Sequence, residues 1–150
     1  MSLFDLKGKV AVVTGGNGGI GLGMALGLAE AGAAIAISGR NAEKNAAAAA
    51  EVAKLGVAVA TFETDVTSDA ACQKLIADAA ARFGRIDILI NNAGINIRKQ
   101  PQDLSLAEWR QVLDTNLTSA FACSQAVYPH MKAVKGGKII NIGSMMSIFG

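Results

Sequence analysis

The sequence is poor in the residues that build metal sites and disulfide frameworks. It contains one histidine and two cysteines, Cys72 and Cys123, which lie far apart and form no Cys-x-x-Cys pair. This pattern argues against a zinc site and against a small disulfide-stapled domain. It favours buried thiols in a reducing compartment. We therefore expect no metal in the functional site.

Charge and long apolar runs are also scarce. Charged residues make up 17% of the chain, the formal net charge is +2, and lysine and arginine are scattered. No basic cluster suggests a nucleic-acid or membrane-surface partner. Residues 1–9 have no apolar signal core, and no apolar run reaches membrane-spanning length. The sequence predicts a soluble, cytoplasmic protein that binds neither nucleic acid nor membrane.

What the chain has in quantity is apolar residues and glycine. Of its 150 residues, 51% are hydrophobic and 17 are glycine. Segments rich in apolar residues at 10–13, 34–38, 57–62, 86–90 and 138–142 are expected to be strands, and helix-type segments separate them. Uniformly apolar strands separated by helices predict an α/β fold with a doubly wound parallel sheet of the Rossmann type. We expect one dinucleotide-binding domain over residues 1–150.

Four expected helices have clear start or stop signals. The first ends at Gly32, the second is capped by Asn41 and ends at Gly56, and the third begins at residue 67 or 68 and ends before residue 84. Ser105 and Glu108 form a capping-box pattern that opens a long fourth helix.

A glycine cluster at residues 14–21 lies between the first strand and the first helix. It fits GxGxxG through Gly16, Gly18 and Gly21, and TGxxxGxG through Gly15, Gly19 and Gly21. Glycines there let the backbone and a helix N-terminus approach a pyrophosphate. A tight strand-to-helix turn is the alternative interpretation.

The end of the second strand has an arginine where the classical dinucleotide fold has an acidic residue. The segment at residues 37–41 contains Arg40 and no carboxylate. A guanidinium can pair with a 2′-phosphate, which a carboxylate would repel. Arg40 therefore favours NADP(H), with NAD(H) as the alternative cofactor. A solvated loop position for Arg40 is the alternative interpretation.

Polar residues follow the third and fourth strands at the carboxyl edge of the sheet. Asp65 and Val66 follow the third strand, and residues 91–94, Asn-Asn-Ala-Gly, follow the fourth. A doubly wound sheet binds its ligand at this edge. On these grounds alone, Asp65 could also be a turn or helix-capping residue.

Five motifs in order resemble the classical short-chain dehydrogenase/reductases along residues 9–150. They are the TGxxxGxG cluster, Asp65, Asn-Asn-Ala-Gly at 91–94, Asn116 within Asp-Thr-Asn-Leu-Thr, and Ser144 within Asn-Ile-Gly-Ser. The resemblance implies the following cofactor contacts: pyrophosphate at Gly15, Asn17, Gly18, Ile20 and Gly21, adenine at Asp65 and Val66, and ribose at Asn92, Ala93 and Gly94.

The resemblance also implies two catalytic residues. Ser144 would hydrogen-bond the substrate carbonyl or hydroxyl, and the backbone of Asn116 would order a water in a proton relay. Without the surrounding motifs, Ser144 would be interpreted as an ordinary turn serine.

The family's Tyr-x-x-x-Lys pair should follow the serine by about a dozen residues. Tyr128 and Lys132 have the right spacing but precede Ser144. We also expect Pro129 to disrupt the helix that would align them, and the pair to lie toward the wrong edge of the sheet. The chain is therefore expected to be the N-terminal part of a longer one-domain enzyme, with the sheet truncated after the fifth strand.

These features predict an oxidoreductase that interconverts a secondary alcohol and a ketone with NADP(H). Residues 91–98 and 143–147 resemble those of members that act on sugar acids, such as gluconate 5-dehydrogenases and 2-deoxygluconate 3-dehydrogenases. Arg98 could pair with a substrate carboxylate or be a solvated loop charge. The alternatives are a 3-oxoacyl thioester reductase and a non-catalytic dinucleotide-binding module.

The resemblance further implies a homotetramer, or another homo-oligomer, in the complete enzyme. The helix over residues 117–126 is rich in alanine and low in charge. Packing between subunits and packing in the core explain this composition equally well.

Overall fold

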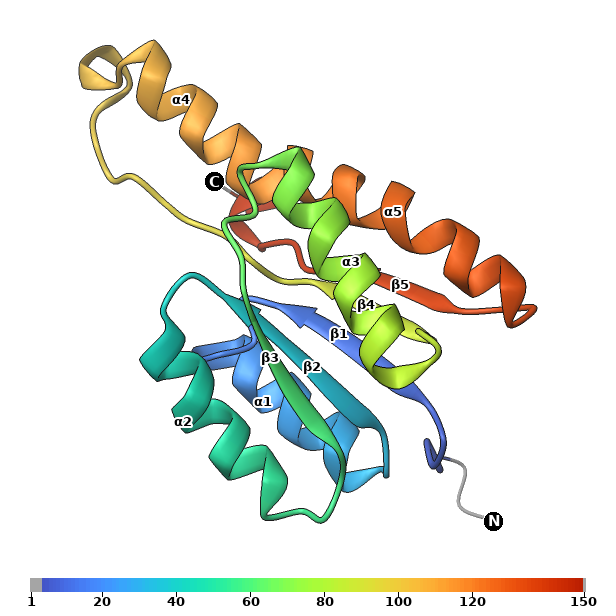
Figure 1. Cartoon of the computed structure of the whole chain (residues 1–150). Coiled ribbons are helices and arrows are strands. Elements are labelled where there is room, and N and C mark those ends of the chain that lie inside the picture. The colour runs from blue at the N-terminus through green and yellow to red at the C-terminus, as the bar shows by residue number, and fades with distance from the viewer. Residues whose placement is uncertain (1–3, 150) are drawn as a thin grey trace.

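Five parallel strands form a single sheet in the computed structural model, which describes residues 4–149 (Figure 1). Both ends of the predicted domain, Met1 and Gly150, lie outside the described residues. The strands are β1 (Val10–Thr14), β2 (Ala34–Gly39), β3 (Val59–Glu63), β4 (Ile88–Asn91) and β5 (Lys138–Asn141), in the order β3-β2-β1-β4-β5. The order reverses on either side of β1, which confirms the doubly wound Rossmann-type sheet.

Helices cover both faces of this sheet. Helices α1 (Gly19–Glu30) and α2 (Ala42–Ala53) lie on one face, and α3 (Asp69–Phe83) and α5 (Ser119–Ala133) lie on the other (Figure 1). The expected caps are present: Asn41 accepts from the backbone N–H of Lys44, and Ser68 accepts from that of Ala71. Ser68, rather than Thr67, is thus the N-cap of α3.

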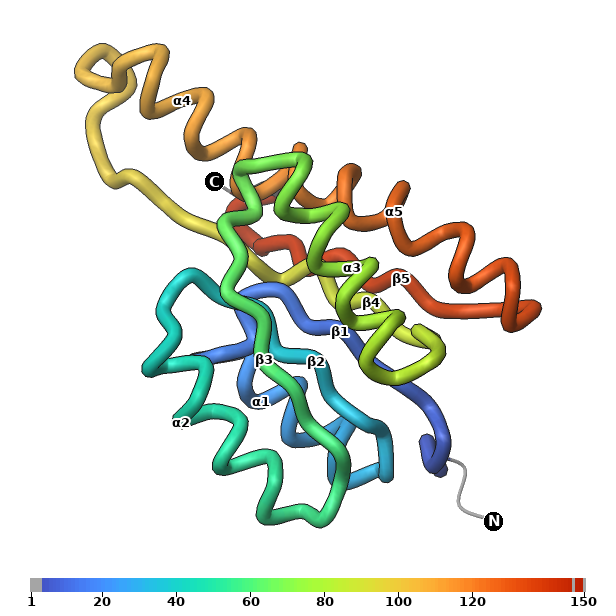
Figure 2. Tube along the Cα trace, viewed as in Figure 1, coloured from blue at the N-terminus to red at the C-terminus, as the bar shows by residue number. Residues whose placement is uncertain are grey.

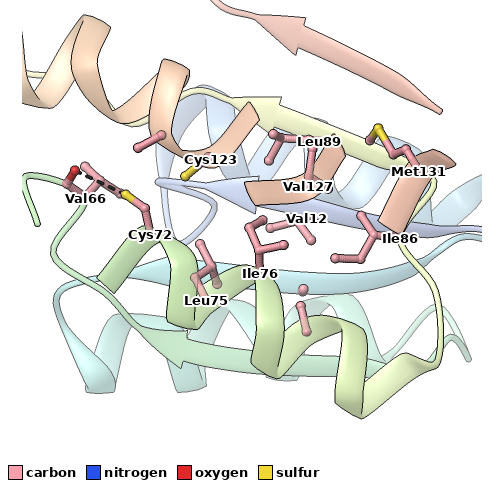
Figure 3. Packing of buried hydrophobic residues seen from close by; sticks show 13 residues of the cluster. Val12, Val66, Cys72, Leu75, Ile76, Ile86, Leu89, Cys123, Val127 and Met131 are labelled. Carbon is pink, nitrogen blue, oxygen red and sulfur yellow. Dashed lines mark hydrogen bonds between the residues drawn. The ribbon is translucent and has the colours of Figure 1, made fainter. Parts of the chain in front are cut away.

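The buried apolar residues form one cluster on each face. The cluster between the sheet and α3 and α5 includes both cysteines, as Figure 3 shows. The thiol of Cys72 donates to the carbonyl oxygen of Val66 at 3.4 Å. Both cysteines are fully buried, as the sequence predicts. The thiol contact ties the segment after β3 to the core.

The strand β5 departs from the expected burial. All four of its residues are exposed, although the apolar pattern predicts a strand covered on both faces. Within the described residues, β5 pairs with β4 alone and forms one edge of the sheet. The side chains of Ile139 and Ile140 are 39% and 44% exposed.

The long fourth helix is interrupted, and Figure 2 shows its first part extending away from the sheet. The helix α4 (Leu106–Leu113) begins with the predicted capping box between Ser105 and Glu108. A π-helical turn, η2 (Asp114–Thr118), joins α4 to α5. The expected disruption at Pro129 is wrong, because α5 continues through this residue to Ala133.

Two short helices complete the described chain. They are the 3₁₀ turn η1 (Pro101–Asp103), which precedes α4, and α6 (Met146–Phe149), which follows β5. None of the helices in the described part of the chain is both long enough and apolar enough to cross a membrane.

Candidate dinucleotide site

A cavity of about 730 Å³ opens at the carboxyl ends of the strands. All eleven residues expected from the sequence to contact a cofactor line it. They are Gly15, Asn17, Gly18, Ile20, Gly21, Arg40, Asp65, Val66, Asn92, Ala93 and Gly94. Parallel strands direct their carboxyl ends to the same edge, so segments far apart in sequence meet there.

Thr14, at the end of β1, joins the glycine-rich loop to the segment after β4. Its hydroxyl oxygen accepts from the backbone N–H groups of Asn92 and Ala93 at 3.0 and 3.1 Å. The side-chain amide of Asn92 donates in return to the carbonyl oxygens of Thr14 and Gly15 at 3.1 and 3.2 Å. These bonds fix two walls of the cavity relative to each other.

The N-terminus of α1 offers backbone donors without a competing side chain. Its N-cap residue, Gly18, makes no side-chain capping bond, and its first turn holds no acidic residue. A Cβ atom at Gly18 would meet nothing within 4 Å, so the backbone there is open to a ligand. Free N–H groups at a helix N-terminus bind phosphate, and this end of the cavity therefore fits a diphosphate.

Close packing behind the loop requires glycine at position 21. A Cβ atom there would overlap the carbonyl oxygen of Gly15 and lie 2.5 Å from the side-chain nitrogen of Asn92. Gly15 itself has φ +63°, a left-handed conformation that favours glycine. Glycine is thus needed at position 15 for the turn and at position 21 for the close approach of α1 to that turn.

The cavity wall also carries charge of both signs. Arg40 and Lys44 line it together with Asp65, the one carboxylate among the lining residues. The backbone N–H and hydroxyl of Thr67 donate to Oδ1 of Asp65 at 3.0 and 2.8 Å. These bonds, and then the charge of Arg40, hold the pKa of Asp65 below its ordinary value. Asp65 therefore stabilises the turn at Thr67 and also lines the cavity.

The cavity wall also includes a buried hydroxyl with no protein partner. Ser38 is fully buried, and its Oγ makes no hydrogen bond to any described residue. Buried polar groups normally have partners, and those that lack one can mark a ligand or water position. An orphaned hydroxyl beside the charged end of the cavity is compatible with a polar ligand such as an adenosine ribose.

The two expected catalytic residues lie outside this cavity lining. Asn116 is in η2, and its side chain binds the backbone of Ile95 through two hydrogen bonds. Its neighbour Thr115 lines the cavity. Ser144 follows β5, is exposed, and its hydroxyl accepts from the backbone N–H of Met146 at 3.2 Å.

The Tyr128 and Lys132 pair lies elsewhere, as the sequence predicts. Both line a separate hollow with Gly136, Gly137 and Ile139. These last residues lead into and begin β5, so the hollow lies at the amino edge of the sheet and the dinucleotide cavity at the carboxyl edge. Arg98 is exposed on the segment between β4 and η1 and does not line the cavity.

Sequence reasoning missed eight residues of the cavity wall. Each lies within four positions of a residue named from the sequence, four before such a residue and four after one, so the same segments bring them to this edge. They are Ser38, Gly39, Asn41, Lys44, Thr64, Thr67, Ile95 and Thr115. Residues 4–149 contain no group of three or more histidine, cysteine or acidic side chains placed to hold a metal ion.

Known proteins are similar to this chain in both sequence and fold. The model of the short chain dehydrogenase family matches residues 9–150. The 2-dehydro-3-deoxy-D-gluconate 5-dehydrogenase of Escherichia coli strain K12 is 43% identical over 151 residues, which cover 100% of this chain and 59% of that protein. The NADP-dependent mannitol dehydrogenase of Alternaria alternata is 40% identical over 149 residues, which cover 95% of this chain and 55% of that protein.

A solved structure agrees closely. The crystal structure of NAD⁺-bound xylitol dehydrogenase superposes with a TM-score of 0.92 at 40% identity, over 97% of this chain and 56% of that one. The chain thus spans little more than half the length of these proteins. The family match over nearly all of the chain, together with the superposed sheet, gives one conclusion: the chain belongs to the short chain dehydrogenase family.

Proposed function

We propose that this protein interconverts a secondary alcohol and a ketone, with NADP(H) as its cofactor. The observation that carries the proposal is the single cavity lined by all eleven residues expected to contact a dinucleotide. The uncapped N-terminus of α1 opens into it and supplies the anion-binding end. When bound, the nicotinamide supplies or accepts a hydride.

The residues that line the cavity bind and orient the cofactor. The glycine-rich loop holds the diphosphate, Asp65 and Val66 contact the adenine, and Asn92, Ala93 and Gly94 contact the ribose. The bonds between Thr14 and Asn92 support these assignments, because they fix the spacing between the loop and the segment after β4. A rigid seat places the nicotinamide relative to the substrate before reaction.

The preference for NADP(H) rests on charges of this chain. Arg40 and Lys44 line the same end of the cavity as Asp65, and both can bind a 2′-phosphate. The compared proteins include one named NADP-dependent and one solved with NAD⁺, so family membership is compatible with either cofactor.

Ser144 and Asn116 are the two proposed catalytic residues. The Ser144 hydroxyl donates a hydrogen bond to the substrate oxygen, and the exposed position of this residue after β5 leaves it accessible. Asn116 orders a water through its backbone, while its side chain holds the segment at Ile95.

The proposed substrates are sugar acids or polyols. The names of the two compared relatives denote a deoxygluconate and a mannitol dehydrogenase. Arg98, exposed on the segment that leaves the cavity at Ile95, is available to pair with a substrate carboxylate.

The protein is proposed to form a homo-oligomer, a homotetramer by family resemblance. Large apolar side chains at helical spacing lie exposed along α4, η2 and α5. They are Leu106, Trp109, Leu113, Leu117, Phe121 and Tyr128. An exposed apolar stripe of this kind is typical of a helix that packs against a partner.

Turnover tests the proposed reaction. The complete enzyme, of which this chain is expected to be the N-terminal part, is purified and assayed for NADPH oxidation and NADP⁺ reduction with a panel of keto-sugar acids, polyols and 3-oxoacyl thioesters. We expect activity with a sugar acid or polyol, and loss of it in Ser144→Ala. Activity confined to the thioesters would refute the proposed substrate class, and cofactor binding without turnover would refute the reaction.

A further inference from the structure

A buried asparagine on α2 contacts the glycine-rich loop without lining the cavity. Asn45 is 2% exposed, and the other buried residues of this helix are Ala48 and Val52. Its Oδ1 accepts from the side-chain Nδ2 of Asn17 at 2.7 Å. Asn17, by contrast, lines the cavity.

The same side chain also binds the ends of two strands. The Nδ2 of Asn45 donates to the carbonyl oxygen of Gly39 at 2.9 Å and, at a longer 3.4 Å, to that of Phe62. One buried amide thus joins the carboxyl ends of β2 and β3 to the loop. This amide is costly to replace, because an apolar residue removes the acceptor of the Asn17 Nδ2, while the carbonyl oxygens of Gly39 and Phe62 keep bonds from Thr64.

The pair of asparagines occupies the space beside Gly39. A Cβ atom at position 39 would overlap the Nδ2 of Asn17 and lie 2.7 Å from the Oδ1 of Asn45. Any side chain at position 39 must therefore push Asn17 away from Asn45. Gly39 directly precedes Arg40, so the bridge and the cation are adjacent in the wall.

We infer that Asn45 is a positioning residue for the dinucleotide, an inference that rests on the proposed function. Through Asn17 it holds the glycine-rich loop against β2, in the conformation that presents the amides of α1 to the diphosphate. Because NADP(H) and NAD(H) share the diphosphate, Asn45 sets the affinity for both cofactors. Arg40 acts on the 2′-phosphate and so distinguishes them.

The test compares equilibrium binding of NADPH and NADH to the purified complete protein and to its variants. We expect Asn45→Leu to weaken both by a similar factor of about tenfold, the size of one lost buried hydrogen bond. Val52→Ala, on the same buried face of α2, is the matched control. It removes packing without touching Asn17 and is expected to leave both affinities unchanged.

A double-mutant comparison separates positioning from general destabilisation. If Asn45 acts through Asn17, then Asn45→Leu has no further effect on affinity in an Asn17→Ala background. Gly39→Ala, which displaces Asn17, is expected to reproduce the loss seen in Asn45→Leu. Thermal unfolding of each variant shows whether affinity and stability change together.

Each outcome decides a different claim. Wild-type protein that binds neither nucleotide overturns the proposed function and this inference with it. Wild-type protein that binds, with Asn45→Leu binding equally well, overturns the inference and leaves the proposed function standing. Additive losses in the Asn17→Ala background, or an equal loss in Val52→Ala, also overturn it.

Discussion

The side chain of Asn116 holds the backbone of Ile95 by both of its polar groups. Its Oδ1 accepts from the N–H of Ile95 at 2.8 Å, and its Nδ2 donates to the carbonyl oxygen of the same residue at 2.9 Å. Asn116 lies in the π-helical turn and Ile95 lines the cavity, so this pair couples the break in the long helix to the cavity wall. Short π-helical segments often occur at functional sites.

Replacement of Asn116 by alanine is expected to release this segment. Both hydrogen bonds are lost at an exposed position, so the free energy of unfolding should fall by about 1 kcal/mol. Urea denaturation measures the loss, and NADPH titration should show weaker binding. Asn116→Asp keeps only the acceptor and should give an intermediate result. Unchanged stability and affinity in Asn116→Ala would mean that the pair does not hold the wall.

Two glycines of α1 should respond in opposite directions to alanine. Gly21→Ala forces a Cβ atom against the backbone of Gly15 and is expected to destabilise the fold by about 2 kcal/mol. Gly23→Ala meets nothing within 4 Å and should stabilise the helix by about 0.5–1 kcal/mol. Thermal unfolding of the two variants checks this. Similar shifts in both would contradict the close approach at Gly21.

Arg40 is expected to control the choice of cofactor. Arg40→Glu replaces a cation with a carboxylate that repels a 2′-phosphate, so NADPH affinity should fall at least about tenfold more than NADH affinity. Lys54→Glu makes the same change of charge at an exposed position outside the cavity and is the control. Equal losses for the two nucleotides in Arg40→Glu would remove this residue from the 2′-phosphate site.

Asp87 should make stability depend on pH in the acidic range. It is 6% exposed, and its carboxylate accepts from Arg85, Lys9 and the backbone N–H of Val10. Burial alone would raise the pKa of Asp87, but these donors hold it below its ordinary value of 3.8. Because the pKa of Asp87 is lower in the folded state, its ionised carboxylate stabilises the fold at pH values above the pKa of the unfolded state. This stabilisation is lost as the pH falls through the pKa of the folded state.

Asp87→Asn is the variant that tests this dependence. It should cost about 2 kcal/mol at pH 7, because it weakens bonds to two cations and a buried N–H. Denaturation curves between pH 2 and pH 7 should show a smaller acid-induced loss in the variant than in the wild type. Parallel curves for the two proteins would assign the acid sensitivity to other groups.

The sequence was most informative where local signals and the fold agree. Apolar runs predicted all five strands, and caps such as Asn41 and Ser105 predicted helix starts that the structure confirms. The predicted starts of two strands are wrong by two residues: β3 begins at Val59 and β4 at Ile88, whereas the predicted segments begin at residues 57 and 86. Ile86 is fully buried and Val57 packs against the core, so apolar residues that precede these strands extend the pattern beyond them.

Other features depend on contacts that no local pattern encodes. Asn45 stands before an alanine block without any motif, and only its packing against Gly39 and Asn17 reveals its contacts. The side-chain role of Asn116 requires Ile95, which is distant in sequence. The helix at Pro129 persists despite the missing N–H, so tertiary packing outweighs a local preference there.

A co-crystal structure with NADP⁺ would show directly whether the cavity binds the dinucleotide. We expect the diphosphate at the N-terminus of α1 against the glycine-rich loop, the 2′-phosphate beside Arg40, and the adenine against Asp65 and Val66. A cavity without nucleotide density at saturating NADP⁺, or a nucleotide bound at another surface, would contradict this expectation.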